Sequence, residues 1–440
     1  MKKTMVALAL FLVLLTGTAS AANNYSPFLS WAVQYASYNE SKLKDPYTGW
    51  HVLSDDYAQP NYIDGFSLEW DYYAFTNLDG KFTGTIGITI NDPRAHLGND
   101  SGWVVPGVFP SLQPSGGNAA IIGRFADGTK KAEFLHFGLF NGTTKTAGKD
   151  LRTFDCTMDN GTGYSRQYPL PDGAGGYAGI KLEGESPTMQ WNLTVTPLWP
   201  ERIADRGKTW RIGDDVGVLP AEHFTVNSIW LSIQVKGTIT RKNLHETLEI
   251  DAIGYREDSF GRYAFVTGGW DFTFGLDPVN KTEFMIQTFY PFSKKLDFMY
   301  VQFEHDGQDV FREFRADKGQ LGWEHPEWHW NDAAKICHPS TTKIVAEDSD
   351  YIVEITADIE QEYAPILSDI TIMTKLYVIT ELMPDFVGTV KEKATGKTVA
   401  VLNGTGGGEF STLRNLSGLQ PTDGMCTSTF KPFFRMPFPR

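Results

Sequence analysis

The sequence contains little cysteine, few charged residues and, beyond its first residues, no long hydrophobic run. Only three of its 440 residues are cysteines, which excludes a small domain held together by a disulfide framework. None of the three has metal-site spacing or the local signature of a nucleophile. Acidic residues outnumber basic ones by 53 to 39, so the composition offers no electrostatic case for binding nucleic acid or an anionic membrane. Long helical patterns and short-period repeats are also missing.

The first residues have the pattern of a secretory signal peptide. Lys2-Lys3 precede an apolar run from Met5 to Gly17, and Ala19-Ser20-Ala21 supplies small residues for cleavage. The apolar run is too short to cross a bilayer as a helix. We therefore predict that residues 1–21 are removed, that the mature protein is secreted, and that it has no integral membrane segment.

Asparagine sequons independently favour the secretory pathway. About two or three N-x-S/T sequons are expected by chance for this composition, and the sequence has more. The excess indicates a glycosylated protein of a eukaryotic secretory pathway, with an archaeal surface protein as the alternative. The predicted glycosylation sites are Asn39, Asn99, Asn141, Asn160, Asn192, Asn280, Asn403 and Asn415.

Three cysteines are an odd number for an oxidising compartment, so at most one pair can form within the chain. Cys337 and Cys426 both lie in the C-terminal half, and we predict a disulfide between them. Cys156 would then be left free.

Composition and turn residues predict an all-β fold. Aromatic residues make up 13% of the chain, and glycine is plentiful, a mixture that favours strands and turns over helices. Phe66–Phe75 and Lys81–Ile90 flank an Asp-Gly turn and predict a hairpin, as do Ile229–Thr240 and Leu244–Ile253. The irregular stretch 197–224 is interpreted as a loop or lid over a barrel mouth.

Two consecutive sets of strands without intervening helices favour two antiparallel β-barrel or sandwich domains. We predict an N-terminal domain over residues 22–245 and a C-terminal domain over residues 246–440. The run Gly406-Gly407-Gly408 lacks the lysine of a phosphate loop and indicates a tight bend or a close backbone approach.

The segment Ile250–Gly275 holds the strongest candidate site. Arg256, Glu257 and Asp258 are consecutive, and aromatic residues follow them closely. A carboxyl group pressed against rings is the usual ingredient of a general acid near neutral pH. The alternative is an ordinary ion pair of Arg256 with one of the two acids at a turn between strands.

Two aromatic strands would complete the site. Side chains alternate along a strand, so Glu69, Asp71 and Tyr73 share one face, and Trp70 and Tyr72 share the other. The first face suits a wet or catalytic lumen, or else a solvent-facing side with Trp70 and Tyr72 in the core.

Trp270, Phe272 and Phe274 also share a face by this alternation. They would line a ligand cavity or simply fill a small barrel.

These motifs resemble the hydroxyneurosporene synthase and kievitone hydratase superfamily. FSLEWDYYAFTNLDGKFTGTIGI is similar to its opening strand pair, usually Glu-Trp-Trp-Tyr followed by Asp-Gly, and VKGTITRKNLHETLEIDAIGYREDSFG is similar to its second signature, Gly-Tyr-x-Asp-His-x-Trp-Gly. The resemblance spans roughly Phe66 to Glu409. It implies two lipocalin-like barrels, a pocket for a hydrophobic small molecule, and no metal or organic cofactor.

Members of that superfamily include hydratases and cyclases of the Diels–Alderase type, and the departures from its motifs bear on the choice between them. Asp71 replaces the second tryptophan of the first motif, Glu257-Asp258 replaces the Asp-His pair, and Phe260 replaces the tryptophan. Because the histidine of the hydratase-like motif is missing, cyclisation or cycloaddition is favoured over hydration of a C=C bond. A non-catalytic carrier of a hydrophobic ligand is the third hypothesis.

The predicted roles follow from residue chemistry and from the motifs. Asp258 and Glu257, then Glu69, are the predicted catalytic acids. The predicted substrate-binding residues are Trp70, Tyr73, Tyr255, Phe260, Trp270 and Phe272. His325, Glu327 and His329 would share one face of an extended strand, but Pro326 and the absence of a second ligand cluster argue against a metal site.

Overall fold

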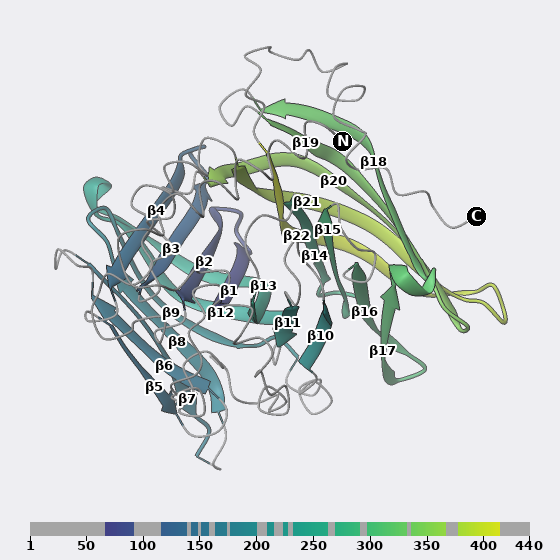
Figure 1. Ribbon diagram of the computed structural model, residues 1–440, viewed down its shortest axis with the longest axis horizontal. Helices are drawn as coiled ribbons and strands as arrows, with labels where there is room; N and C mark the ends of the chain where they lie inside the picture. The colour runs from purple at the N-terminus through teal and green to yellow at the C-terminus, as the bar shows by residue number, and fades with distance from the viewer. Residues whose placement is uncertain are drawn as a thin grey trace, which may run out of the picture.

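A computed structural model gives the fold as two curled antiparallel sheets that form half-barrels (Figure 1). It describes residues 67–91, 116–138, 142–147, 151–157, 163–173, 177–199, 209–214, 223–227, 232–262, 269–290, 297–331, 336–366 and 377–413. Strands dominate these residues, and helix is limited to two single 3-10 turns, η7 (Lys242–Leu244) and η9 (Ala316–Lys318). The predicted all-β class of two barrel-like units is confirmed.

The first sheet contains thirteen strands in the order β4-β3-β2-β1-β13-β12-β9-β8-β7-β6-β5, with β10 paired to β11 and β11 to β13. Its strands are β1 (Ser67–Asn77), β2 (Phe82–Asn91), β3 (Gly116–Phe125), β4 (Lys130–Gly138), β5 (Gly142–Ala147), β6 (Leu151–Thr157), β7 (Tyr164–Pro171), β8 (Tyr177–Glu185), β9 (Met189–Pro197), β10 (Thr209–Asp214), β11 (His223–Asn227), β12 (Ser232–Arg241) and β13 (Glu246–Arg262).

The second sheet contains nine strands in the order β17-β16-β15-β14-β22-β21-β20-β19-β18. Its strands are β14 (Gly269–Asp277), β15 (Thr282–Tyr290), β16 (Phe298–His305), β17 (Gln308–Arg315), β18 (Leu321–Asn331), β19 (Ile336–Glu347), β20 (Tyr351–Ile366), β21 (Tyr377–Glu392) and β22 (Thr398–Leu413). The chain therefore passes from one sheet to the other between Arg262 and Gly269. The predicted domain limit at residue 245 falls between β12 and β13, which are neighbours in the first sheet.

Both predicted hairpins are present, and local turn chemistry explains the first. Gly80 has a positive φ of 69°, which glycine adopts without strain, and the Asp79 carboxylate accepts a hydrogen bond from the Lys81 backbone N–H at 2.9 Å. β1 then pairs with β2 in a regular antiparallel register. These contacts lie within a few residues of one another, so the sequence alone is sufficient to predict them.

The interpretation of residues 197–224 as a loop or lid is wrong in part, because this stretch contains β10 and the first two residues of β11. β13 is 17 residues long and continues past Tyr255, where its pairing with β12 ends at Ser232. β11 takes over as the partner of β13 from Asp258 to Arg262. The added strand supplies backbone hydrogen bonds to an edge that β12 leaves open.

Each sheet curls around its own apolar core. The first core includes Tyr73, Phe75, Trp191 and Val235, all buried. A second cluster, built on residues such as Phe284, Val301, Phe314 and Ile355, fills the other half-barrel. A smaller buried cluster is formed by side chains of β18, β19, β20 and β22 in the second sheet: Trp328, Cys337, Ile359 and Phe410.

The two sheets meet where β1 and β13 lie against β14 and β22, near the centre of Figure 1. Within the second sheet, glycine permits close packing at this place: a Cβ atom added to Gly407 of β22 would lie 2.7 Å from the ring of Phe274, its partner on β14. Gly406 likewise faces the backbone carbonyl of Phe274. The close backbone approach predicted for the glycine run is therefore confirmed.

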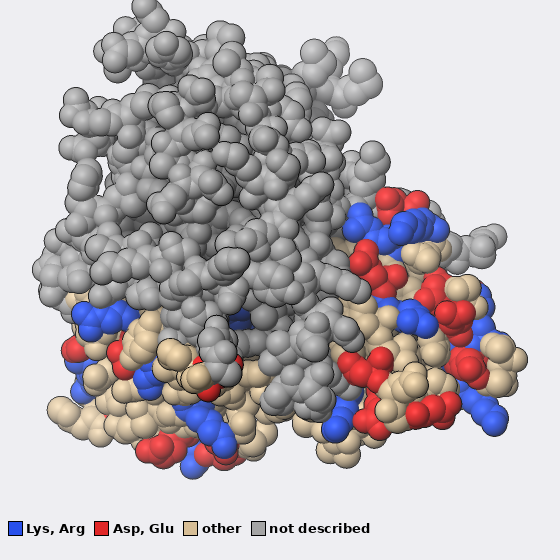
Figure 2. Space-filling view, turned by 90° about the horizontal axis from the view of Figure 1, so that it is seen from below, with Lys and Arg blue, Asp and Glu red and all other residues tan. Residues whose placement is uncertain are grey.

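Charged side chains of both signs are mixed over the described part of the face in Figure 2. Exposed ion pairs such as Lys391–Glu354 and Lys393–Glu347 belong to this kind of surface. Among the described residues, no helix is long and apolar enough to cross a membrane.

Candidate active site between the two sheets

Strand register divides the central residues between two faces of the first sheet. Arg256 lies opposite Tyr73 on β1, whereas Tyr255 lies opposite Ala74 and Glu257 opposite Tyr72. Because opposite residues project from the same face, Arg256 and Tyr73 point one way, and Tyr255 and Glu257 the other.

The first face is the interior of the first half-barrel. Tyr73 belongs to its apolar core, and the Arg256 guanidinium lies 5.6 Å from the centre of the Tyr73 ring. The Arg256 Nε atom donates a hydrogen bond to the Tyr73 hydroxyl at 3.4 Å, and both side chains are buried. The alternative interpretation placed Arg256 at a turn between strands, and this part of it is wrong, because residue 256 lies well inside β13. The ion pair of Arg256 with one of the two acids stays a prediction.

The second face packs against the second sheet and holds the candidate site. The Tyr255 hydroxyl donates a hydrogen bond of 2.8 Å to Glu257 Oε2, and both residues are buried, with only 5% of Glu257 exposed. The Tyr255 ring stacks on Phe274 with centroids 4.8 Å apart and touches Phe272 at 5.3 Å. The buried carboxyl group of Glu257 thus lies two residues along β13 from Tyr255, whose ring packs against the second sheet.

Tyr72 also contacts these rings, and we call Tyr72, Tyr255, Phe272 and Phe274 together the aromatic wall. Tyr72 lies opposite Glu257 in the register, and its ring meets Phe272 edge to face at 6.1 Å. Edge-to-face and stacked pairs of this kind bring a positive ring edge against a negative face and add to the energy of burial. Rings from the second sheet therefore pack against Tyr255, whose hydroxyl donates to Glu257, and against Tyr72.

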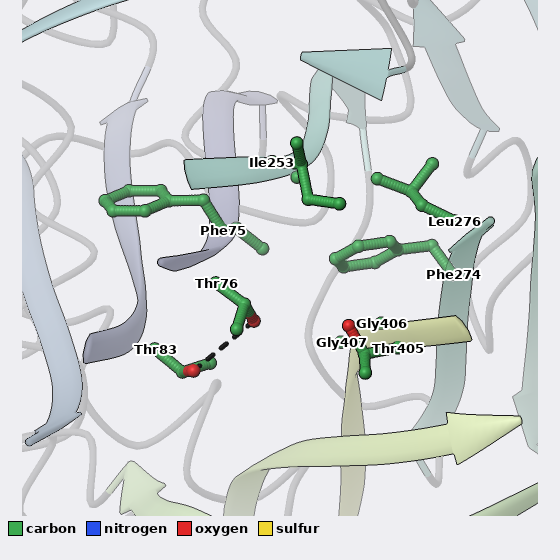
Figure 3. A pocket seen from close by; sticks show the side chains of 11 residues that line it. Phe75, Thr76, Thr83, Ile253, Phe274, Leu276, Thr405, Gly406 and Gly407 are labelled. Carbon is green, nitrogen blue, oxygen red and sulfur yellow. Dashed lines mark hydrogen bonds between the residues drawn. The ribbon is translucent and has the colours of Figure 1, made fainter. Parts of the chain in front are cut away.

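Figure 3 shows a narrow cleft beside this group, between β1, β2 and β13 on one side and β14 and β22 on the other. Thr76 and Thr83 hydrogen-bond to each other on the first-sheet side, and Phe274 and Leu276 face them from the second sheet. The cavity volume is only about 10 Å³, room for roughly one water molecule. Phe274 lines the cleft and also stacks on Tyr255, so the cleft adjoins the candidate site.

The structure brings three of the predicted site residues together: Glu257, Tyr255 and Phe272. Tyr73 is not part of this group, because it lies on the opposite face of the same sheet. Strand positions are described for Asp258, opposite Asp71 and Asn227, and for Glu69, opposite Phe260. The side chains of Asp258, Glu69, Trp70, Phe260 and Trp270 lie outside what the structure describes, and their roles stay predictions.

Two residues beside the site, Ser232 and Gln287, were not among the residues predicted from the sequence. Phe274 was predicted only together with Trp270 and Phe272, as residues that line a cavity or fill a small barrel. Ser232 lies opposite Tyr255, and Gln287 lies opposite Phe272. Their importance depends on strand pairing between distant segments, and no local motif surrounds either residue.

The histidine group does not share one face as predicted. His325 is buried, whereas Glu327 and His329 are exposed, because two register shifts around Glu327 break the alternation of β18. His325 Nε2 lies 2.9 Å from Asp271 Oδ2, and its Nδ1 lies 2.9 Å from Thr342 Oγ1. Within the described part of the chain, no cluster of three metal-ligating side chains is found.

Cys337 is buried and disulfide-bonded. Its predicted partner, Cys426, lies outside the described residues, so the pairing stays a prediction. The predicted glycosylation sites at 39, 99, 141, 160 and 415 also lie outside them. Asn192, Asn280 and Asn403 are described and exposed.

Comparison with solved structures decides the fold. The chain matches CghA with a TM-score of 0.52 and 12% identity, over 82% of this chain and 91% of that one. The two share a fold. A protein assigned as AttH from Nitrosomonas europaea matches with a TM-score of 0.47 and 15% identity, over 79% of this chain and 92% of that one. Kievitone hydratase from Nectria haematococca matches with a TM-score of 0.44 and 12% identity, over 83% and 95%.

The double lipocalin-like fold implied by the sequence resemblance is thereby confirmed. No family model matches the chain, and no curated protein sequence matches it.

Proposed function

We propose that this protein is a secreted, glycosylated, cofactor-independent enzyme that cyclises an apolar small molecule between its two sheets. The observation that carries the proposal is the buried Tyr255–Glu257 hydrogen bond at 2.8 Å, together with the packing of the Tyr255 ring on Phe272 and Phe274 of the second sheet. A site built only to fill space would have no need of a carboxyl group at this position, because burying one is costly.

The substrate class follows from the walls of the site. Phe272, Phe274 and Tyr72 offer ring surfaces that suit the carbon skeleton of an isoprenoid, a polyketide or a prenylated phenol. Ring faces also attract positive charge that develops on carbon during cyclisation. Holding two reacting carbons in near-attack geometry removes a large entropic part of the barrier.

Glu257 and Tyr255 supply the polar chemistry. The Glu257 carboxyl group can exchange a proton with a bound molecule in a place from which the surrounding rings exclude water. The Tyr255 hydroxyl fixes the orientation of that carboxyl group. Asp258 and Glu69 are proposed as further acids, and Trp70, Phe260 and Trp270 as further walls, on the strength of the motifs that contain them.

Hydration of a C=C bond is the second candidate, and the same carboxyl group favours it. An acid placed beside an apolar skeleton can protonate an alkene carbon, after which water adds to the neighbouring carbon. Cyclisation ranks first because the histidine of the hydratase-like motif is replaced here by Asp258.

Mass spectrometry separates these activities. The full-length protein, expressed in a secretory host, is incubated with linear polyenes and prenylated phenols. Cyclisation yields a product of unchanged mass and altered retention, whereas hydration adds one water. Glu257→Gln should abolish acid-dependent turnover while apolar ligands still bind, and Phe272→Ala should weaken binding as well. Binding without any product would overturn the enzyme in favour of a carrier.

A further inference from the structure

Two buried side-chain oxygens belong to strand neighbours of Tyr255 and Phe272. Ser232 begins β12 directly opposite Tyr255, and Gln287 lies on β15 directly opposite Phe272. Only 2% of Ser232 and 5% of Gln287 are exposed. Ser232 Oγ and Gln287 Oε1 are among the described buried atoms that have no hydrogen-bond partner.

Strand register places both side chains in the layer between the sheets. Directly opposite residues on antiparallel strands project from the same face, with Cβ atoms about 5 Å apart. Ser232 therefore shares the face of Tyr255, and Gln287 the face of Phe272. The centroids of the Tyr255 and Phe272 rings lie 5.3 Å apart across the layer, so Ser232 and Gln287 are the strand neighbours, one in each sheet, of two rings in contact.

Buried polar groups in folded proteins nearly always have a partner, and each exception calls for an explanation. Ser165 on β7 has the same property, but β7 is separated from β13 in the sheet by β12, β9 and β8. Ser232 and Gln287 differ from it because they border the aromatic wall of the candidate site. A bound molecule is the simplest source of the missing hydrogen bonds.

We propose that Ser232 and Gln287 bind the polar end group of an otherwise apolar substrate, and that this group is a hydroxyl. This inference rests on the proposed function and names the substrate class: an isoprenoid or polyketide-like alcohol. A hydroxyl donates one hydrogen bond and accepts others. It can therefore donate to Gln287 Oε1 and accept from the Ser232 hydroxyl, while the hydrocarbon chain lies on the rings.

Competition between an alcohol and its hydrocarbon counterpart tests the proposal. In this experiment, farnesol and farnesene are each titrated as competitors of the fluorescent apolar reporter N-phenyl-1-naphthylamine on the full-length protein. We expect farnesol to bind about tenfold more tightly than farnesene, the effect of one or two net hydrogen bonds. Ser232→Ala and Gln287→Leu should each reduce this preference to about threefold or less and leave farnesene affinity unchanged.

The controls distinguish failure of the hydroxyl site from failure of the proposed function on which it rests. Ser165→Ala removes an equally buried oxygen away from the site and should keep the full preference for farnesol. Gln287→Met preserves side-chain length should Gln287→Leu fail to fold. Equal affinity of both probes, or a preference that survives both substitutions, overturns the hydroxyl site but keeps the apolar one. If neither probe displaces the reporter, or Phe272→Ala changes neither affinity, the proposed function itself fails.

Discussion

His325 Nε2 lies 2.9 Å from Asp271 Oδ2, which joins two strands that are not neighbours in their sheet. β14, which carries Asp271, pairs with β15 and β22, whereas β18, which carries His325, lies at the far end of the sheet order. Both side chains are buried, and the other imidazole nitrogen of His325, Nδ1, lies 2.9 Å from Thr342 Oγ1. The contact therefore crosses the interior of the second half-barrel, and we expect it to stabilise the curvature of this sheet.

Replacing this histidine should loosen the second half-barrel. His325→Ala removes the imidazole beside the buried Asp271 carboxylate, which should lower the free energy of unfolding by about 3 kcal/mol. His329→Ala on the same strand removes an exposed ring and serves as the matched control. Denaturant unfolding of both variants measures the difference, and equal midpoints would show that the contact contributes nothing to closure.

The sequence pointed to His325 for the wrong reason. Strict alternation placed it with Glu327 and His329, but the register shifts around Glu327 turn His325 and Trp328 both toward the interior. Bulges depend on how two strands fit together, so they are invisible in one strand read alone. Asp271, its partner, lies more than fifty residues earlier in the chain.

The Tyr255–Glu257 hydrogen bond should appear as a coupling energy. Tyr255→Phe removes the donor and Glu257→Met the acceptor, so the double variant should lose about 1–2 kcal/mol less than the sum of the single losses. Thr240→Val breaks the exposed Thr240–Thr247 contact on β12 and β13 and should be additive with Tyr255→Phe. Urea unfolding gives all the values, and additivity for both pairs would contradict a bonded Tyr255–Glu257 unit.

Gly407 should tolerate no side chain. A Cβ atom there would lie 2.7 Å from the Phe274 ring, which stacks on Tyr255, so Gly407→Ala must displace part of the aromatic wall. We expect a loss of about 1–3 kcal/mol in the free energy of unfolding, together with weaker binding of apolar probes. Gly87→Ala, in a strand with no atom within 4 Å of the added Cβ, is the control and should change neither.

Local sequence patterns predicted which residues of one strand share a face, but not which residues of different strands meet at the site. Alternation along β1 correctly separated Tyr72 from Tyr73, and this separation decides which tyrosine faces the second sheet. Alternation could not show that Tyr255 and Tyr73 lie on opposite faces, because that requires the register of β1 against β13. Ser232 and Gln287 can be placed beside the site only when the pairing of their strands is known.

Acid should weaken the contact between Asp127 and Arg241. Hydrogen bonds from the backbone and side chain of Thr129, and then from Arg241, lower the pKa of Asp127 from 3.8 to about 2. The unfolded chain therefore binds more protons between these values, and the stabilisation is present above pH 3.8 and lost as pH falls toward 2. Asp127→Asn should lower the melting temperature at neutral pH, and the deficit should shrink through that window. A deficit independent of pH would contradict the assignment.

Secretion predicts that the exposed sequons carry glycans. Asn192 and Asn403 project from strands, and Asn280 lies in the turn between β14 and β15, where its amide donates to Asp277 Oδ2 at 2.7 Å. When the protein is made in a eukaryotic secretory host, N-glycosidase should reduce its mass, and Asn192→Gln, Asn280→Gln and Asn403→Gln should each remove one glycan. Thr194→Ser keeps the sequon of Asn192 and should keep its glycan. A secreted protein whose mass the enzyme leaves unchanged would refute glycosylation while leaving the site between the sheets intact.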